Sequence, residues 1–111
     1  AFGDLLGFLK QVFKGLGALT YLKPAHVHRD LRWGTQMVDS KGCLRLTAFD
    51  EAVKEGEVVQ MKFHTAYTAP ECKNMKTCKA APSQDAYSAG VMAAITLCGA
   101  PEYFIYLGAI E

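Results

Sequence analysis

The sequence Val27-His28-Arg29-Asp30-Leu31-Arg32 lies between a stretch with helical periodicity and a stretch with the character of a hairpin. Upstream of it, apolar residues recur at the spacing of one buried helical face: Leu5, Leu9, Val12, Phe13 and Leu16. Pro24 then disfavours the helical conformation at the residue before it. We therefore expect a helix over residues 4–22 that leads into the quoted sequence.

Two short extended runs follow the quoted sequence, at residues 36–38 and 43–46. The four residues between them, Asp39-Ser40-Lys41-Gly42, are typical of a turn. We expect a β-hairpin here, with Asp39 shaping its turn and not binding a metal. Residues 47–81 show little periodicity, and a segment of that length without clear structure usually indicates function or disorder.

A second helix is predicted over residues 83–98, starting near Pro82 and stopping at Gly99. Its side chains are apolar or small on every face, and a helix without a polar face must be surrounded by protein. Two helices and one hairpin predict a mainly α fold with a short β-hairpin.

Composition and charge exclude several classes of function. The chain has 111 residues, enough for one domain with a modest core, and its 12 Lys and Arg against 11 Asp and Glu give a net charge of +1. That balance offers no case for binding nucleic acid or an anionic membrane. The longest uncharged run, residues 86–101, is 16 residues long, whereas a spanning helix needs about 20 apolar residues. We expect no nucleic-acid partner and no membrane span.

The four cysteines do not follow a metal-binding pattern. The chain has no C-x-x-C pair and no zinc spacing that includes histidine, so we expect no metal site. Cys72 and Cys78 flank a polar stretch and either form a local disulfide or remain free thiols. The sequence leaves both alternatives open.

Four motifs occur in a fixed order along the chain. They are Val27-His28-Arg29-Asp30-Leu31-Arg32, Leu46-Thr47-Ala48-Phe49-Asp50, Tyr67-Thr68-Ala69-Pro70-Glu71 and Asp85-Ala86-Tyr87-Ser88-Ala89-Gly90-Val91. Together they resemble the catalytic loop, a degraded D-F-G, the A-P-E end of the activation segment and the central helix of a protein kinase C-terminal lobe. The resemblance implies a partial kinase-like C-terminal lobe over residues 1–111, with the catalytic-loop region at 26–38, the degraded activation segment at 48–71 and the central helix at 83–98. The Gly-rich loop and the V-A-I-K lysine of an N-terminal lobe do not occur, which implies a fragment or a reduced relative.

The same resemblance implies that the catalytic machinery is vestigial. Asp30 lies at the position of the catalytic base, where it either acts or only holds the loop, and Arg32 lies at that of a basic residue near the phosphates. Thr35 stands where the family has a metal-binding asparagine, and Ala48 replaces the D-F-G aspartate. Phosphoryl transfer depends on positioned metal ions, so these losses imply a pseudokinase that binds neither ATP nor magnesium. Asp50, two positions after Ala48, is the alternative carboxylate from which a metal site could be rebuilt.

Other positions have structural roles by resemblance. His28 and Phe49 resemble residues that stack between a helix and the catalytic loop. Asp85 either caps its helix or anchors the loop around His28 and Arg29 with a buried carboxylate, which would need such partners. Glu71 would pair with an arginine outside the portion of the lobe that this sequence resembles.

Further positions suggest regulation or binding. In active kinases the residue equivalent to Arg29 pairs with a phosphorylated activation segment, and Thr65, Tyr67 and Thr68 are the candidate phosphoacceptors; ordinary loop hydroxyls are the alternative. Trp33 either fills space beside an empty nucleotide site or contributes to a binding face.

These features predict a catalytically inactive kinase-like module that acts by protein–protein interaction or allosteric regulation. Its partners would be other proteins, such as an active kinase or a large complex. Two alternatives stay open: an active or residual ATP-dependent protein Ser/Thr kinase within a longer chain, and a structural subunit of a larger assembly. The degenerate catalytic loop also resembles the secreted rhoptry pseudokinases of apicomplexan parasites, which implies secretion, with a cytoplasmic location as the alternative.

Overall fold

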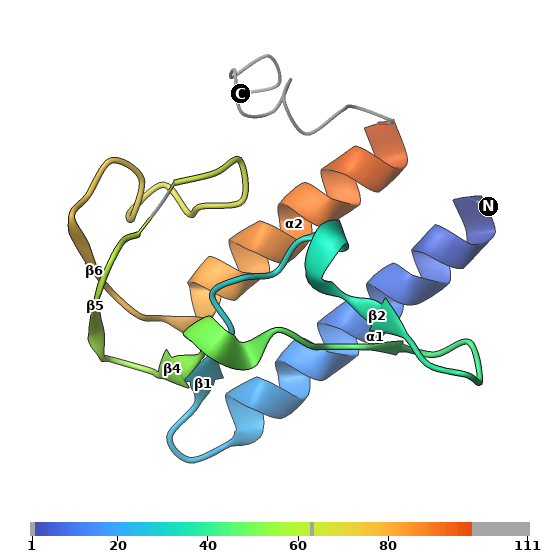
Figure 1. Ribbon diagram of the computed structural model, residues 1–111, viewed down its shortest axis with the longest axis horizontal. Coiled ribbons are helices and arrows are strands. Elements are labelled where there is room, and N and C mark those ends of the chain that lie inside the picture. Colours follow the sequence, from blue (N-terminus) through green and yellow to red (C-terminus); the bar gives the residue numbers. More distant parts are fainter. Residues whose placement is uncertain (1, 63, 99–111) are drawn as a thin grey trace.

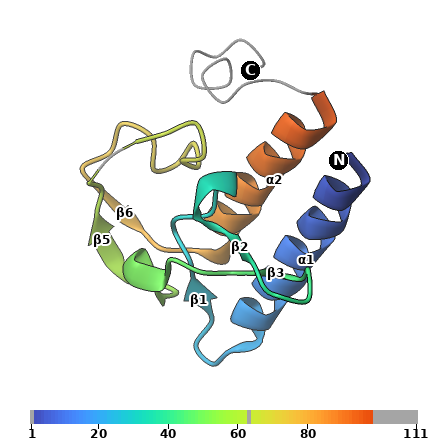
Figure 2. The ribbon, with the colours of Figure 1, turned by 45° about the vertical axis from the view of Figure 1, so that its right-hand side comes forward.

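The structure is a computed structural model of the chain and describes residues 2–62 and 64–98. Within these residues, two α-helices come first and last in the chain. Short strands and two turns of 3-10 helix lie between them in sequence. In chain order the elements are α1 (Phe2–Tyr21), β1 (His26–Val27), η1 (Trp33–Thr35), β2 (Met37–Val38), β3 (Leu44–Arg45), η2 (Phe49–Glu51), β4 (Val53–Lys54), β5 (Val58–Gln60), β6 (Thr77–Lys79) and α2 (Pro82–Cys98). The helices α1 and α2 lie side by side, and β5 and β6 lie away from α1 (Figure 1; Figure 2).

The prediction of a mainly α fold is wrong, because the described residues form a mixed α/β structure. Three antiparallel strand pairs accompany the two helices: β1 with β4, β2 with β3, and β5 with β6. Two of these pairs involve the segment 47–81, which shows little periodicity. Their strands are two or three residues long, too short for the alternation of apolar and polar residues that identifies a strand.

The predicted hairpin is confirmed as the β2–β3 pair, in which Val38 lies opposite Leu44. Asp39 shapes its turn as expected. One carboxylate oxygen accepts hydrogen bonds from the backbone N–H groups of Lys41 and Cys43, both at 2.9 Å. The hydrogen bond from Cys43 is the largest of the contacts that lower the pKa of Asp39.

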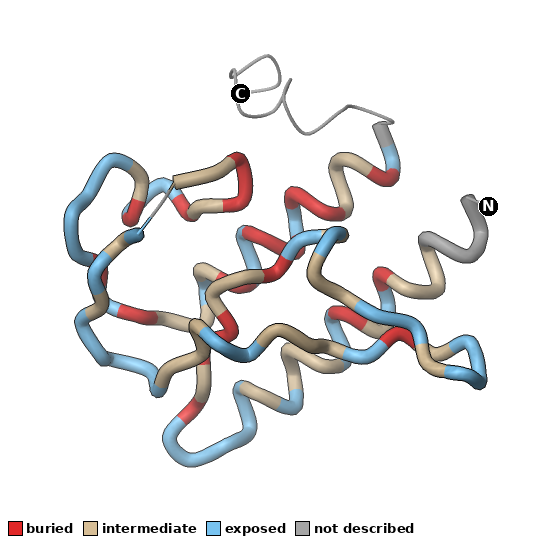
Figure 3. The backbone as a smooth tube through the Cα atoms, in the orientation of Figure 1, coloured by how far each residue is buried: buried red, intermediate tan, exposed pale blue. Residues whose placement is uncertain are grey.

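The core lies between the two helices and the segment that contains Leu31 and Leu44, which crosses them (Figure 3). Its members come from α1, α2, the segment from β1 to β3, and the turn around residue 67: Leu9, Val12, Leu31, Leu44, Tyr67, Ala89, Val91 and Met92. Val12 and Met92 are fully buried, and complete burial of such a side chain contributes about 1.5–3 kcal/mol. Because α1 and α2 face each other across this core, the loop between β1 and η1 is fixed against both.

Both predicted helices are present with slightly different limits. The helix expected at 4–22 spans Phe2–Tyr21, and the helix expected at 83–98 spans Pro82–Cys98; the predicted stop at Gly99 lies outside the described residues. The described residues cover α2 on one side, while Tyr87 and Leu97 are exposed. Neither described helix has the length and apolar character needed to cross a bilayer.

Two glycines of α1 give a matched test of helix packing. A Cβ at Gly15 would lie 2.6 Å from Cδ1 of Leu46, whereas a Cβ at Gly17 would meet nothing within 4 Å. We expect Gly17→Ala to raise the free energy of unfolding by up to about 1 kcal/mol through helix propensity. Gly15→Ala must displace Leu46 and should lose most of that gain. Urea denaturation of the two variants measures the difference, and equal gains would contradict the close approach of Leu46 to α1.

Candidate functional site

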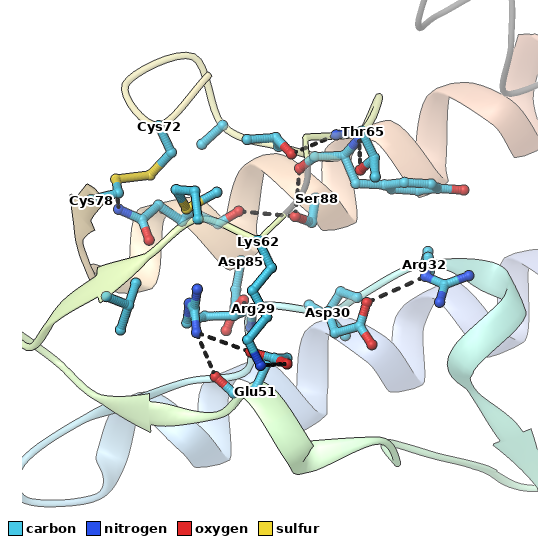
Figure 4. A pocket seen from close by; sticks show the side chains of 17 residues that line it. Arg29, Asp30, Arg32, Glu51, Lys62, Thr65, Cys72, Cys78, Asp85 and Ser88 are labelled. Carbon is cyan, nitrogen blue, oxygen red and sulfur yellow. Dashed lines mark hydrogen bonds and ion pairs between the residues drawn. A yellow bond between two sulfur atoms is a disulfide. The ribbon is translucent and has the colours of Figure 1, made fainter. Parts of the chain in front are cut away.

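A pocket of about 70 Å³ lies between the β1–η1 loop, the first turns of α2 and the segment from β5 to β6 (Figure 4). The loop contributes residues 29–32, α2 contributes Gln84, Asp85 and Ser88, and the 59–78 segment supplies much of the rest. Both charged and apolar groups line it. The pocket therefore brings together residues from the first, third and fourth sequence motifs.

The carboxylate of Asp85 anchors the β1–η1 loop to α2. One oxygen accepts a hydrogen bond of 2.6 Å from the backbone N–H of His28, and the other accepts one of 3.0 Å from the backbone N–H of Arg29. Asp85 is 3% exposed, and burial raises the pKa of this carboxyl above its ordinary value. Of the two expected roles, Asp85 has the buried anchoring one, because α2 already begins at Pro82.

His28 connects the loop to the segment that follows β3. Its Nδ1 accepts the backbone N–H of Asp30 at 3.1 Å, so the proton of a neutral ring resides on Nε2, which donates to the carbonyl of Thr47 at 2.6 Å. The ring also contacts Phe49, with centroids 4.8 Å apart. The His28 ring therefore contacts both neighbours of Ala48, the carbonyl of Thr47 and the ring of Phe49.

The residues at the catalytic-loop positions are paired with one another. The carboxylate of Asp30 forms an ion pair of 3.3 Å with Arg32. The hydroxyl of Thr35 lies 2.8 Å from the Asp30 carbonyl, to which it donates, and accepts a hydrogen bond of 2.6 Å from Gln36. Asp30 is thus held mainly through its backbone, and the Thr35 hydroxyl is directed into the loop.

Ala48 adopts a left-handed backbone conformation, with φ of 61° and ψ of 52°. It offers no side-chain oxygen, and Asp50, the alternative carboxylate, lies on the exposed surface of η2. Among the residues that the structure describes, no group of three or more His, Cys, Asp or Glu side chains is arranged to hold a metal ion.

The cations that line the pocket each form an ion pair with a carboxylate of the same pocket. Arg29 pairs with Glu51 at 3.6 Å and donates to its backbone carbonyl at 3.0 Å. Lys62 pairs with the other carboxylate oxygen of Glu51 at 3.1 Å, and Arg32 pairs with Asp30. Arg29 therefore contacts a carboxylate at the position where the resemblance predicts a phosphoryl group. No sequence motif indicated Glu51 or Lys62.

The three candidate phosphoacceptors form one turn beside the pocket. The backbone N–H of Thr65 donates to the Thr68 hydroxyl, and that of Tyr67 donates to the Thr65 hydroxyl. Ser88 of α2 donates to the Tyr67 carbonyl at 2.8 Å. Because Tyr67 is buried in the core, the two threonines are the acceptors that a modifying enzyme could reach in the folded chain.

Trp33 and Glu71 lie outside the pocket lining. The Trp33 indole N–H donates to the Met92 carbonyl at 3.2 Å, and its ring packs on the core, which favours the space-filling role over a binding face. Glu71 is exposed and forms no ion pair with any residue of the described ranges.

The open question about Cys72 and Cys78 is settled by a disulfide between them. Both residues are buried and line the pocket. Their spacing of six residues was compatible with a bond, but the sequence alone could not show that β6 turns Cys78 toward Cys72.

Comparison with known proteins gives no matching family model, and no curated protein matches the chain. The resemblance to protein kinases therefore depends on the residues of this chain alone.

The Asp85 anchor can be tested by replacing its carboxylate. Asp85→Asn leaves one acceptor oxygen and directs an amide NH₂ at the second backbone N–H, and a buried group left without its partner costs about 1–3 kcal/mol. We expect the free energy of unfolding to fall by that amount in urea denaturation. Asp50→Asn, on the exposed surface, should change it by less than about 0.5 kcal/mol. Equal effects of the two substitutions would show that Asp85 is not an anchor.

The raised pKa of Asp85 also predicts a pH dependence. The native state binds the Asp85 proton more tightly than the unfolded state, in which the pKa of the carboxyl lies near 3.8. The stability that this carboxyl contributes therefore falls as the pH rises from about 3.8 through the pKa of the folded state. The stability difference between the wild-type chain and Asp85→Asn should therefore decrease over that interval and become constant above it. Denaturation curves at a series of pH values measure it, and a difference that grows with pH would contradict the raised pKa.

Proposed function

We propose that the chain is a catalytically inactive, kinase-like module that acts through protein binding or allosteric regulation. The observation that carries this proposal is the state of the two positions that the resemblance assigns to magnesium ligands. Ala48 has a methyl group at one position. At the other, the Thr35 hydroxyl donates a hydrogen bond to the Asp30 carbonyl. Magnesium is bound through oxygen ligands, commonly carboxylates together with substrate phosphates, and neither position supplies a carboxylate.

The charge arrangement of the pocket supports the same proposal for ATP. A triphosphate is attracted by cations that are free to bind its oxygens. Arg29 and Lys62 instead share Glu51, and Arg32 is paired with Asp30. Arg29 is the least exposed of the three cations, and a nucleotide would have to displace Glu51 from it. We propose that the module works without ATP and without magnesium.

Partners are proposed to be other proteins, such as an active kinase or a large complex. Exposed apolar side chains occur on the β2–β3 hairpin, at Met37 and Val38, and on α2, at Tyr87 and Leu97. Exposed apolar patches mark interaction sites, and we propose that these side chains contribute to one. The disulfide favours the secreted alternative over the cytoplasmic one, because disulfides persist in oxidising compartments.

A structural subunit of a larger assembly is a second candidate, favoured by the side of α2 that the described residues leave exposed. Tyr87 and Leu97 would be buried by such a partner. Sedimentation of the purified chain tests this candidate, since a stable, soluble monomer would argue against it.

Thermal unfolding in the presence of nucleotide tests the absence of ATP binding. A ligand at one hundred times its Kd stabilises a protein by about 2.7 kcal/mol. We expect no shift of Tm with millimolar ATP, either with magnesium or with a chelator. A shift with ATP alone would contradict the nucleotide part of the proposal and indicate a metal-independent ligand, while a shift that requires magnesium would indicate a rebuilt metal site.

A further inference from the structure

The Cys72–Cys78 disulfide joins two parts of the pocket wall that are held in different ways. One is the anchored turn, residues 65–72, which contains Cys72. The other is the outer hairpin, residues 56–62 and 76–80. It contains Cys78, which lies in β6. Both parts line the pocket, and the disulfide lies where they meet (Figure 4).

The anchored turn is fixed to the core. Tyr67 belongs to the core cluster, and Ala69 is buried. Ser88 of α2 donates a hydrogen bond to the Tyr67 carbonyl, and the backbone N–H of Cys72 donates to the Ala69 carbonyl at 3.0 Å. Cys72 therefore occupies a position that the core determines.

The outer hairpin has much weaker support. None of its described residues belongs to the core cluster, and its strands are three residues long with most side chains exposed. Backbone hydrogen bonds close it, such as Met61 N–H to the Lys76 carbonyl and Ala80 N–H to the Glu57 carbonyl, both 2.8 Å. A two-stranded hairpin of this kind is marginal by itself.

Polar contacts tie the outer hairpin to the rest of the chain beyond the disulfide, among them contacts to η2 and to α2. Lys62 pairs with Glu51 at 3.1 Å, but the lysine side chain is 69% exposed, and exposed ion pairs contribute little. The Gln84 amide of α2 donates to the Lys79 carbonyl at 2.7 Å and lies 3.6 Å from Sγ of Cys78. The covalent bond is thus the strongest constraint between this hairpin and the anchored turn.

We propose that the disulfide is a redox-sensitive latch that holds the outer hairpin against the anchored turn and so closes one wall of the pocket. In an oxidising environment the pocket keeps the shape described above. After reduction the outer hairpin opens locally while the two helices and their core stay folded. This inference does not depend on the proposed function, because it follows from what the disulfide joins.

The chemistry requires a dithiol reductant. A thiolate of the reductant attacks one sulfur, the S–S bond breaks, and the other cysteine leaves as a thiolate. The second thiol of the reductant then attacks the mixed disulfide and releases the first cysteine. The reductant becomes a disulfide, and Cys72 and Cys78 together gain two electrons and two protons. Both sulfurs belong to residues that line the pocket.

Hydrogen exchange of the full chain with and without dithiothreitol tests the latch. After reduction, we expect the amides of Met61 and Ala80 and those paired between β5 and β6 to exchange at least tenfold faster. Amides within α1 and α2 should keep their rates within about twofold, because local opening leaves the core intact. Cys43→Ser, which removes a free thiol, is the control and should respond to dithiothreitol as the wild-type chain does.

Four results would overturn the proposal. Alkylation of Cys72 and Cys78 without prior reduction would show that the bond does not form. Unchanged exchange of the outer hairpin after verified reduction would show that the bond holds nothing. Loss of protection throughout α1 and α2, or failure of the Cys72→Ser, Cys78→Ser double variant to fold, would show a global constraint. A folded double variant with rapid exchange confined to the outer hairpin would support the latch independently of the reductant.

Discussion

The carboxylate of Asp85 is the contact on which the arrangement of the pocket depends. It joins residues 57 positions apart by accepting the backbone N–H groups of His28 and Arg29. Once the loop is fixed in this way, the His28 ring holds Asp30 and Thr47, and the Arg29 side chain reaches Glu51. One buried side chain of α2 thereby orders three segments that are distant in sequence. The position of the loop follows because both oxygens of a buried carboxylate need hydrogen-bond donors.

The sequence predicted the elements whose signals are local. The apolar spacing of α1, the apolar run of α2 and the turn at Asp39 each require only neighbouring residues, and the structure contains all three. The fold class was wrong because β1 pairs with β4 and β5 with β6 through strands of two or three residues. Such strands carry no periodicity of their own, and tertiary contacts decide where they form.

The candidate site divides in the same way. The hydrogen bonds of Asp85 to the loop, which the kinase resemblance implied, are present in the structure, and the rings of His28 and Phe49 contact each other. The pairing of Glu51 with both Arg29 and Lys62 could not be predicted, because nothing in the sequence brings residue 51 near residues 29 and 62. These pairs engage the side chains of Arg29 and Lys62 within the chain.

The central claim is that the chain does not transfer phosphate, and a label-transfer assay tests it most directly. The full chain, in its longest natural form, is incubated with γ-labelled ATP, magnesium and a generic protein substrate, beside an Asp30→Asn variant and an Asp50→Asn control. The account predicts no incorporation above background in any of the three. Incorporation by the wild-type chain that Asp30→Asn abolishes and Asp50→Asn preserves would contradict it, because Asp30 would then be a working catalytic base.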